Sequence, residues 1–478
     1  MSKRKLLSRM LTSALLAFLG GCAVGPDYVA PEFDMPAAWA GAPQDMQVKV
    51  RADALAEWWT LFDDPALVGL VKQAVSNSPD LEIALARVRE ARAQQGVVRA
   101  DLIPGIDASS SASTTSSEDR AGVSDWRELY TAGVDAVWEI DIFGGRRRSL
   151  QSANANIEIR EADYFDVLIS LAAETAFTYV DIRAFQERLQ ITQSNLEAQQ
   201  ETLVLTLWRA QAGIGTSLEV EQARSNLEST RALIPALEGE LAAALNRLSI
   251  ILGEAPGGLD AIIVQRGPVP VATEDMAAGV PADLLRQRPD IRSAERSLAF
   301  QSARIGVAEA NLYPKFFLLG SIGGSSMEIS DIFGSANVAK SFSSSITTPI
   351  FQAGRLRQNV RVEDALFEQA LAGYESTVLS ALKEVEDAFA SLNATRQTTD
   401  ALENGVDAAR NAYEFARLEY EAGVINFFQV LDAQRSLLTQ EDSLVQSRAS
   451  ETTAAIALYK ALGGGWDASA TNETVHGY

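Results

Sequence analysis

The feature that most constrains the fold is an internal repeat, because the chain carries one unit twice at a nearly constant offset of 210 residues. Short markers recur in the same order along the whole unit: Pro79-Asp80 returns as Pro289-Asp290, Gly96-Val97 as Gly306-Val307, Ala212-Gly213 as Ala422-Gly423, and Leu252-Gly253 as Leu462-Gly463. Self-similarity at a fixed offset indicates one structural unit built twice. Residues 79–253 are predicted to form repeat 1 and residues 289–463 repeat 2.

Each repeat is predicted to open with a helix and continue with two strands. The helices cover residues 81–100 and 291–310, and each ends shortly before a proline, which a helix does not easily continue through. The first strands, residues 106–115 and 316–326, are rich in serine and glycine. The second strands alternate, with these side chains sharing a face: Tyr130, Ala132, Val134, Ala136, Trp138 and Ile140 in repeat 1, and Phe342, Ser344, Ile346, Thr348 and Ile350 in repeat 2. A soluble two-layer protein could show the same alternation, but hairpins beside very long helices have no obvious core to cover.

A very long helix is predicted after each strand pair. After Gly144-Gly145 the chain runs to Ala212 without proline. One stripe recurs at alternating steps of four and three residues, which is a heptad seam: Tyr164, Leu168, Leu171, Thr175, Thr178, Ile182, Phe185, Leu189, Thr192 and Leu196. A second stripe lies one residue over: Phe165, Ile169, Ala172, Ala176 and Tyr179. About 65 helical residues make a rod of roughly 100 Å, and two seams predict two packing neighbours, as in the wall of a tube.

Glycines end this helix, and the chain is then predicted to return. Gly213 and Gly215 predict a tight turn, and the returning seam from Val220 to Ile251 contains Pro235, which removes a backbone donor and should bend the helix. Repeat 2 follows the same plan, with its turn at Ala422-Gly423. Heptads alone are typical of a structural coiled-coil protein. Strands at the far end of the helices favour a conduit instead.

The N-terminus carries the signature of an exported lipoprotein. Four basic residues precede the apolar run 11–19, which is too short to span a bilayer stably, so residues 1–21 are predicted to be a signal peptide. Leu19-Gly20-Gly21-Cys22 resembles the lipobox of bacterial lipoproteins, which implies diacylglyceryl and N-acyl chains (palmitate among them) on Cys22. Ala23 after this cysteine suggests sorting to the outer membrane. Cys22 is the only cysteine, so no disulfide is expected.

Composition excludes several classes of protein. The chain has 41 Lys and Arg residues against 63 Asp and Glu, a net charge of -22, which argues against a nucleic-acid partner. Beyond the signal peptide no apolar run is long enough for a transmembrane helix, so a membrane crossing would have to be a β-barrel. The only histidine, His476, lies near the chain end. The sequence therefore predicts no enzyme, no metal site and no cofactor apart from the lipid on Cys22. No function is assigned to Arg146-Arg147-Arg148.

Taken together, short motifs over nearly the whole mature chain are highly specific in their order. They are Gly25-Pro26-Asp27-Tyr28, Trp58-Trp59-Thr60-Leu61-Phe62, Trp138-Glu139-Ile140-Asp141-Ile142-Phe143-Gly144, Ile234-Pro235-Ala236-Leu237-Glu238, Arg286-Gln287-Arg288-Pro289-Asp290-Ile291, Tyr420-Glu421-Ala422-Gly423, and Val430-Leu431-Asp432-Ala433-Gln434-Arg435. On these motifs the chain resembles the TolC-like outer-membrane factors. It is similar to their NodT-type lipoprotein branch, which serves RND-type tripartite efflux systems.

The resemblance implies an α+β membrane protein that acts as a homotrimer. Four strands per chain would form a trimeric 12-stranded β-barrel in the outer membrane, continued by a long periplasmic α-helical coiled-coil tunnel. Four strands alone cannot close a membrane barrel, for which about eight are the usual minimum. In this scheme residues 22–78 form an N-terminal anchor arm and equatorial segment, residues 254–288 an equatorial linker, and residues 464–478 a C-terminal tail.

By the same resemblance, a gate closes the periplasmic end where the two helical tips of each chain converge. Phe428 and Asp432 stand four residues apart and share a helix face, with Tyr420 across the turn. The family has an acidic lumen residue at the position of Asp432 and typically a leucine at that of Phe428, so the phenylalanine departs from its pattern. Glu219 in the first tip is a weaker match. Each charge could equally be a solvated helix end.

Three functions are compatible with these features. The first is the exit duct of a tripartite efflux pump for drugs, toxic compounds or metal ions, with a periplasmic adaptor (membrane fusion) protein and an inner-membrane RND pump as partners. The second is the outer-membrane duct of a type I protein secretion system. The third is a periplasmic coiled-coil scaffold lipoprotein without a pore. Lipidation and the motifs favour the first.

Overall fold

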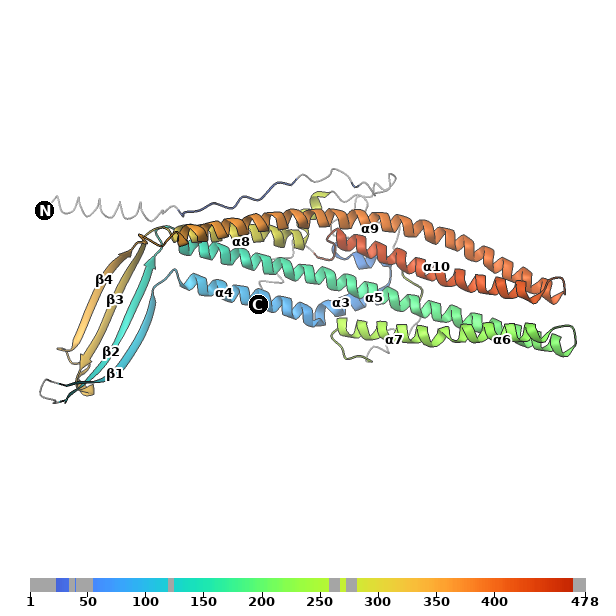
Figure 1. The fold of residues 1–478 in the computed structure, drawn as a ribbon, viewed down its shortest axis with the longest axis horizontal. Helices are drawn as coiled ribbons and strands as arrows, with labels where there is room; N and C mark the ends of the chain where they lie inside the picture. The colour runs from blue at the N-terminus through green and yellow to red at the C-terminus, as the bar shows by residue number, and fades with distance from the viewer. Residues whose placement is uncertain are drawn as a thin grey trace. The chain divides into compact units, whose positions relative to one another are not determined.

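The computed structural model describes residues 23–33, 39, 55–118, 124–257, 267–271 and 282–466. These residues fall into two compact units (Figure 1). The sheet unit takes the described residues within Met1–Phe33, Ala86–Glu161 and Arg292–Ser376, and the hairpin unit takes those within Asp34–Leu85, Ala162–Ile291 and Thr377–Tyr478. The long helices α5 and α9 contribute residues to both units.

The two repeats have the same order of elements. Repeat 1 consists of α4 (Pro79–Ala100), β1 (Gly105–Glu118), β2 (Ser124–Ile140), α5 (Gly145–Gln211), α6 (Ser217–Arg231) and α7 (Leu233–Ile251). Repeat 2 consists of α8 (Pro289–Ala310), β3 (Lys315–Ser326), β4 (Val338–Thr347), α9 (Arg355–Glu421) and α10 (Phe427–Ala461). The short helices η1 (Trp58–Phe62), α3 (Pro65–Asn77), η2 (Ala282–Gln287) and η3 (Ile329–Asp331) complete the described elements. The predicted internal duplication is confirmed.

The four strands form a single antiparallel sheet in the order β1-β2-β3-β4. The two hairpins therefore join, because β2 also pairs with β3. Residues directly opposite one another share a face of a sheet, so the register defines two faces. One is largely apolar: Ile106, Val134, Trp138, Ile140, Phe316, Leu318, Phe342 and Ile346. The other is largely polar: Asp107, Ser109, Ser111, Thr131, Asp135, Ser321, Ser343 and Ser345.

The prediction for the last strand is wrong at its C-terminal end. β4 ends at Thr347, so Thr348 and Ile350 lie outside the sheet. Pro349 follows at once, and proline has no backbone N–H to donate to a neighbouring strand. The alternation of side chains in the sequence therefore continues past Thr347, the last residue of β4.

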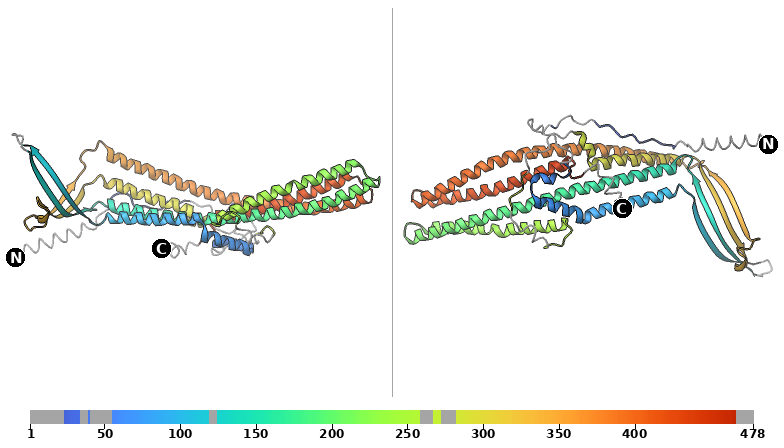
Figure 2. Two further views of the ribbon diagram at one scale, coloured as in Figure 1. Left: turned by 90° about the horizontal axis from the view of Figure 1, so that it is seen from below. Right: turned by 180° about the vertical axis from the view of Figure 1, so that it is seen from behind.

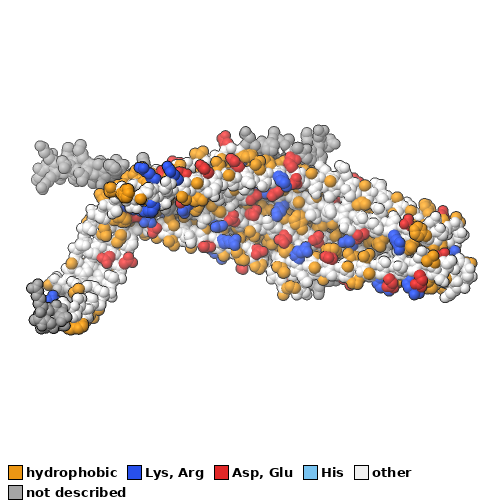
Figure 3. Space-filling view, in the orientation of Figure 1, with side chains coloured by type: hydrophobic (Ala, Val, Ile, Leu, Met, Phe, Trp, Pro, Cys, Tyr) orange, Lys and Arg blue, Asp and Glu red, His pale blue; other side chains and the backbone are white. Residues whose placement is uncertain are grey.

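The apolar face of the sheet remains open in one copy of the chain. Ile106, Phe342 and Ile346 are large apolar side chains that lie exposed on it. Figure 3 shows few charged side chains over the strands, in contrast to the helices. Among the described residues, no helix combines the length and the apolar character needed to cross a membrane.

Both predicted seams of α5 are buried in the hairpin unit. Thr175, Thr178 and Ile182 belong to the first stripe, and Ala172 and Tyr179 to the second, and all five are buried. In the views of Figure 2, α6 and α7 run alongside α5, and α10 runs alongside α9. The prediction that α5 packs against neighbouring helices on two sides is confirmed, because Asp181 of α5 forms an ion pair with α7 at 3.3 Å and Arg188 of α5 forms one with α10 at 2.6 Å.

The returning helix of repeat 1 is interrupted near its proline, as predicted. α6 ends at Arg231 and α7 begins at Leu233, with Ala232 between them. Pro235 cannot donate the backbone hydrogen bond that a helix would direct to Arg231, four residues earlier. The return in repeat 2 has no proline, and α10 is continuous over 35 residues.

An aromatic core lies where η1 meets α10 in the hairpin unit. Trp58 stacks on Tyr459 with their ring centroids 5.9 Å apart and packs edge-on against Trp59 and Phe62. Asp64 then caps α3, since its Oδ1 accepts hydrogen bonds from the backbone N–H groups of two residues in the first turn. The other oxygen of Asp64 accepts a hydrogen bond of 2.6 Å from the Tyr179 hydroxyl, which ties α3 to α5.

Candidate functional site

The tips of the two helical hairpins end in the same way. Gly213 follows α5 and Gly423 follows α9, each with a φ of 76°, a left-handed conformation that favours glycine. The backbone N–H of Ile214 donates to the Arg209 carbonyl (3.0 Å), and that of Val424 donates to the Glu419 carbonyl (2.9 Å). The repeat therefore sets an equivalent turn at both tips.

The helices that leave the turns begin differently. α6 has a capping box, in which the Glu219 N–H donates to the Thr216 hydroxyl and the Glu219 carboxylate accepts from the Thr216 N–H, both at 3.3 Å. α10 follows Asn426, whose side chain makes no capping hydrogen bond. Glu219 thus has a local structural role in holding the first tip.

Tyr420 joins the two hairpins. Its side chain is 3 % exposed and packs with Ala223 of α6 and with Phe427, Val430 and Leu431 of α10. The guanidinium of Arg209, near the end of α5, lies 4.5 Å from the centre of the Tyr420 ring. The same guanidinium donates to the Tyr420 carbonyl at 3.3 Å. Tyr420 is therefore an interior contact between the two tips.

Charged neighbours act on the Tyr420 hydroxyl. Burial raises the pKa of Tyr420, the nearby Glu219 carboxylate raises it further, and Arg209 opposes the shift. The tyrosine therefore remains neutral at physiological pH. The Tyr420 hydroxyl itself is buried without a hydrogen-bond partner among the described residues, so ring packing and the Arg209 contacts join α9 to α6 and α5.

Phe428 and Asp432 lie on a different surface from Tyr420. Phe428 is 59 % exposed, and Asp432 is also exposed. Both line a shallow hollow of about 260 Å³, whose opposite side is formed by Ala409 and Ala412 of α9. The predicted pair does share one face of α10, and this face is open.

The structure therefore separates the four predicted gate residues into two groups. Tyr420 lies inside the contact between the hairpins and Glu219 caps α6 nearby, whereas Phe428 and Asp432 are exposed. Phe427, and not Phe428, packs against Tyr420, with ring centroids 5.5 Å apart. The spacing of Phe427, Val430, Gln434 and Leu437, which are all buried, is a heptad seam that sequence reasoning could have used to find the inner face.

Polar side chains also connect the hairpins, and sequence reasoning missed them. Arg188 of α5 forms an ion pair with Asp442 of α10 at 2.6 Å. Asn226 of α6 accepts a hydrogen bond from Arg435 (2.8 Å) and donates one to Gln434 (3.3 Å). Asn226 and Gln434 are buried. Nothing in the spacing of single helices shows which polar residues will meet across two hairpins.

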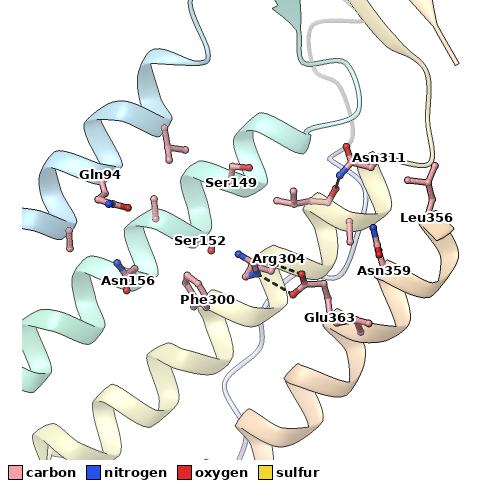
Figure 4. A pocket seen from close by; sticks show the side chains of 16 residues that line it. Gln94, Ser149, Ser152, Asn156, Phe300, Arg304, Asn311, Leu356, Asn359 and Glu363 are labelled. Atoms are coloured by element: carbon pink, nitrogen blue, oxygen red, sulfur yellow. Dashed lines mark hydrogen bonds and ion pairs between the residues drawn. The ribbon is translucent and has the colours of Figure 1, made fainter. Parts of the chain in front are cut away.

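A larger hollow, of about 710 Å³, lies within the sheet unit among α4, α5, α8 and α9. Figure 4 shows that its lining combines amide and hydroxyl side chains with short apolar ones. Arg304 and Glu363 form an ion pair in it at 3.0 Å, and this pair holds the pKa of Glu363 below its usual range. Because the two charges neutralise each other, the lining offers no strong charge for a ligand.

The predicted lipid site, Cys22, lies outside the described residues. The described chain begins at Ala23, directly after it. Among the described residues, no group of three or more His, Cys, Asp or Glu side chains is placed to hold a metal ion.

Comparison with known proteins identifies the family. The model of the family described as outer membrane efflux protein matches residues 70–254 and 280–464. The chain belongs to the outer membrane efflux protein family. Its two matched stretches correspond to the two repeats, and together they cover more than half of the chain.

Full-length relatives agree with this assignment. The chain is 34 % identical to the solvent efflux pump outer membrane protein SrpC of Pseudomonas putida over 463 residues, covering 95 % of this chain and 97 % of the relative. It is 30 % identical to nodulation protein T of Rhizobium leguminosarum bv. trifolii, covering 96 % of this chain and 98 % of the relative. The predicted resemblance to NodT-type efflux proteins is confirmed.

Solved structures of the family share the fold. The outer-membrane channel OprN superposes with a TM-score of 0.86 at 36 % identity, covering 93 % of this chain and 100 % of the OprN chain. CusC superposes with a TM-score of 0.78 at 30 % identity, covering 91 % and 100 %. This outer membrane efflux protein is therefore a channel subunit of the outer membrane with a periplasmic extension, and its fold class is the one predicted.

Proposed function

We propose that three copies of the chain assemble into the exit duct of a tripartite efflux pump. The open sheet carries this proposal. It has two free edges, β1 and β4, and four strands are too few to close on themselves. Pairing β4 of one copy with β1 of the next would give a closed twelve-stranded barrel. Its apolar face would meet lipid and its polar face would meet water.

The helices would then continue the barrel as a periplasmic tunnel. In this arrangement the hairpin tips face the inner membrane, where a periplasmic adaptor and an inner-membrane RND pump deliver the cargo. The hollow in the sheet unit offers no unpaired charge that would select a cargo, because its lining charges, Arg304 and Glu363, form an ion pair with each other. The pump and adaptor, and not the duct, would therefore choose the cargo.

Light scattering in detergent tests the assembly. With the mass of bound detergent subtracted, the purified protein should weigh about three times one chain, because only assembly closes the sheet. Circular dichroism of the same sample should show both helix and strand. A folded monomer that retains the strand signal would rule out the proposed barrel.

The gate is proposed at Phe428 and Asp432. Both side chains are exposed on one face of α10, and in a trimer with this face towards the threefold axis three copies of each would surround the opening. Three carboxylates in a narrow ring repel one another unless cations or hydrogen bonds offset the charge. The Asp432 ring would then favour cations, and the Phe428 ring would supply the steric block. Tyr420 and Arg209 would hold the second tip against the first, and Glu219 would cap α6 within the first tip.

We also propose that Cys22 carries the lipid anchor. Metabolic labelling with radioactive palmitate should mark the wild-type protein and leave Cys22→Ser unlabelled, because the variant has no thiol to acylate. Both proteins should be present in equal amounts in an immunoblot of the same cells. Palmitate on Cys22→Ser would show that the anchor lies elsewhere.

A further inference from the structure

The segment directly after Cys22 is bound to the sheet unit by specific contacts. Arg148 in the first turn of α5 is only 4 % exposed. Its guanidinium donates to the carbonyl oxygens of Val24 and Gly25, each at 3.0 Å, and forms an ion pair with Asp27 at 2.9 Å. A buried arginine needs such partners. Here residues 24–27 supply three of them.

Glycines allow the segment to approach this closely. A side chain on Gly25 would place its Cβ 2.4 Å from the Cα of Gly306 in α8, which no real contact permits. A Cβ on Gly144 would lie 2.6 Å from the Cβ of Ala23. The backbone N–H of Val24 also donates to the Phe143 carbonyl at 3.0 Å. The packing of this segment against the sheet unit therefore leaves no room for a side chain at position 25 or at position 144.

Tyr28 fixes the other end of the segment. Its hydroxyl donates to the Glu295 carboxylate at 3.0 Å, and the guanidinium of Arg296 lies 5.7 Å from the centre of its ring. Burial and the neighbouring Glu295 carboxylate raise the pKa of Tyr28, so this donor keeps its proton. Residues 23–28 are thus held at both ends, on α5 and on α8.

We propose that residues 23–28 are a built-in ligand of the sheet unit, clasped by Arg148, and that the clasp fixes the acylated Cys22 beside the junction of β2 and α5. This inference rests on the proposed lipid anchor. Ala23 lies against Gly144 at that junction, so the acyl chains would leave the protein one residue from Gly144, which follows the last residue of β2, Ile140, by four positions. Released, the six residues 23–28 could extend by about 20 Å. The clasp would therefore set the height of the sheet in the membrane.

Photocrosslinking from position 28 tests the clasp in the full-length protein. Benzoylphenylalanine in place of Tyr28 keeps an aromatic ring there, and irradiation should link it to the peptide that contains Glu295 and Arg296. Arg148→Ala should lower the yield of this crosslink by about tenfold, since it removes several charge-assisted hydrogen bonds. Gly25→Val should lower the crosslink yield to a similar extent. Because Gly25 lies in the segment 23–28 and not in a helix, this substitution leaves the helices intact.

Two matched variants serve as controls. Arg146→Ala removes an arginine of the same triplet whose ion pairs are with Asp101 and Glu139. Val29→Ala changes an exposed residue of the same segment. Both should crosslink as the wild type does. Wild-type yields in Arg148→Ala and Gly25→Val would overturn the clasp.

Palmitate labelling of the same variants separates the two proposals. All of them should be labelled, because the clasp does not supply the acylated thiol. The crosslink should also persist in Cys22→Ser, since side chains and backbone make it. A missing label with an intact crosslink would refute the lipid anchor and leave the clasp standing. A retained palmitate label with a wild-type crosslink yield in both Arg148→Ala and Gly25→Val would refute the clasp and leave the lipid anchor standing.

Discussion

Phe428→Ala is expected to raise the single-channel conductance several-fold in planar bilayers. The side chain is 59 % exposed beside the hollow on α10, and three copies around one axis would narrow the opening. Truncation to alanine removes three rings from that opening at once. A hydrophobic constriction can gate a pore by excluding water from it, and we expect its removal to have the largest functional effect.

Two comparisons make the result specific. Leu218→Ala changes the residue at the same place in the first tip, 210 positions earlier, which is also exposed, and it should alter conductance less. Asp432→Asn should mainly weaken the preference for cations and any block by divalent ions. Conductance and selectivity that match the wild type in both Phe428→Ala and Asp432→Asn would show that these side chains do not line the constriction.

Trp58→Ala is expected to lower stability by about 3–5 kcal/mol, the usual cost of removing a large aromatic side chain from a core. Trp58 is 0 % exposed and stacks on Tyr459 at 5.9 Å. Its indole nitrogen is buried without a hydrogen-bond partner, so the loss is one of packing rather than hydrogen bonding. The cavity would separate η1 from α10 in the hairpin unit.

Thermal melting in detergent, followed by circular dichroism, measures this effect. Trp208→Ala is the matched control, because Trp208 is 65 % exposed on α5 and an exposed tryptophan contributes little to the core. The melting temperature should fall clearly for Trp58→Ala and stay near the wild-type value for Trp208→Ala. Equal melting of all three proteins would show that the aromatic core does not support the fold.

Much of the fold could be predicted because its elements are long and periodic. The heptad seam through Thr175 and Ile182 requires a buried stripe, and the second stripe through Ala176 and Tyr179 requires another. The repeat provided a second, independent copy of each pattern: Gly213 and Gly423, for example, predict the same turn at both tips. The end of β4 was mispredicted because alternation persists past Pro349, where the backbone can no longer donate.

The candidate site was predictable only in part. Phe428 and Asp432 could be placed on one face of α10 from their spacing, but Tyr420 could not be assigned to the interior, because its contacts come from other helices, α5, α6 and α10. Arg148 was also missed. In the sequence it is one of three consecutive arginines, and only the fold shows that it alone is buried against residues 24–27.

The most direct test of the channel account is the current through purified protein in a planar bilayer. Wild-type protein and Phe428→Ala should be compared at equal amounts after light scattering has shown the assembled form. The assembled protein should give discrete single-channel steps with a preference for cations, and the conductance of each step should be small in the wild type and larger in Phe428→Ala. Assembled protein that inserts into the bilayer yet passes no current in either form would contradict the channel account.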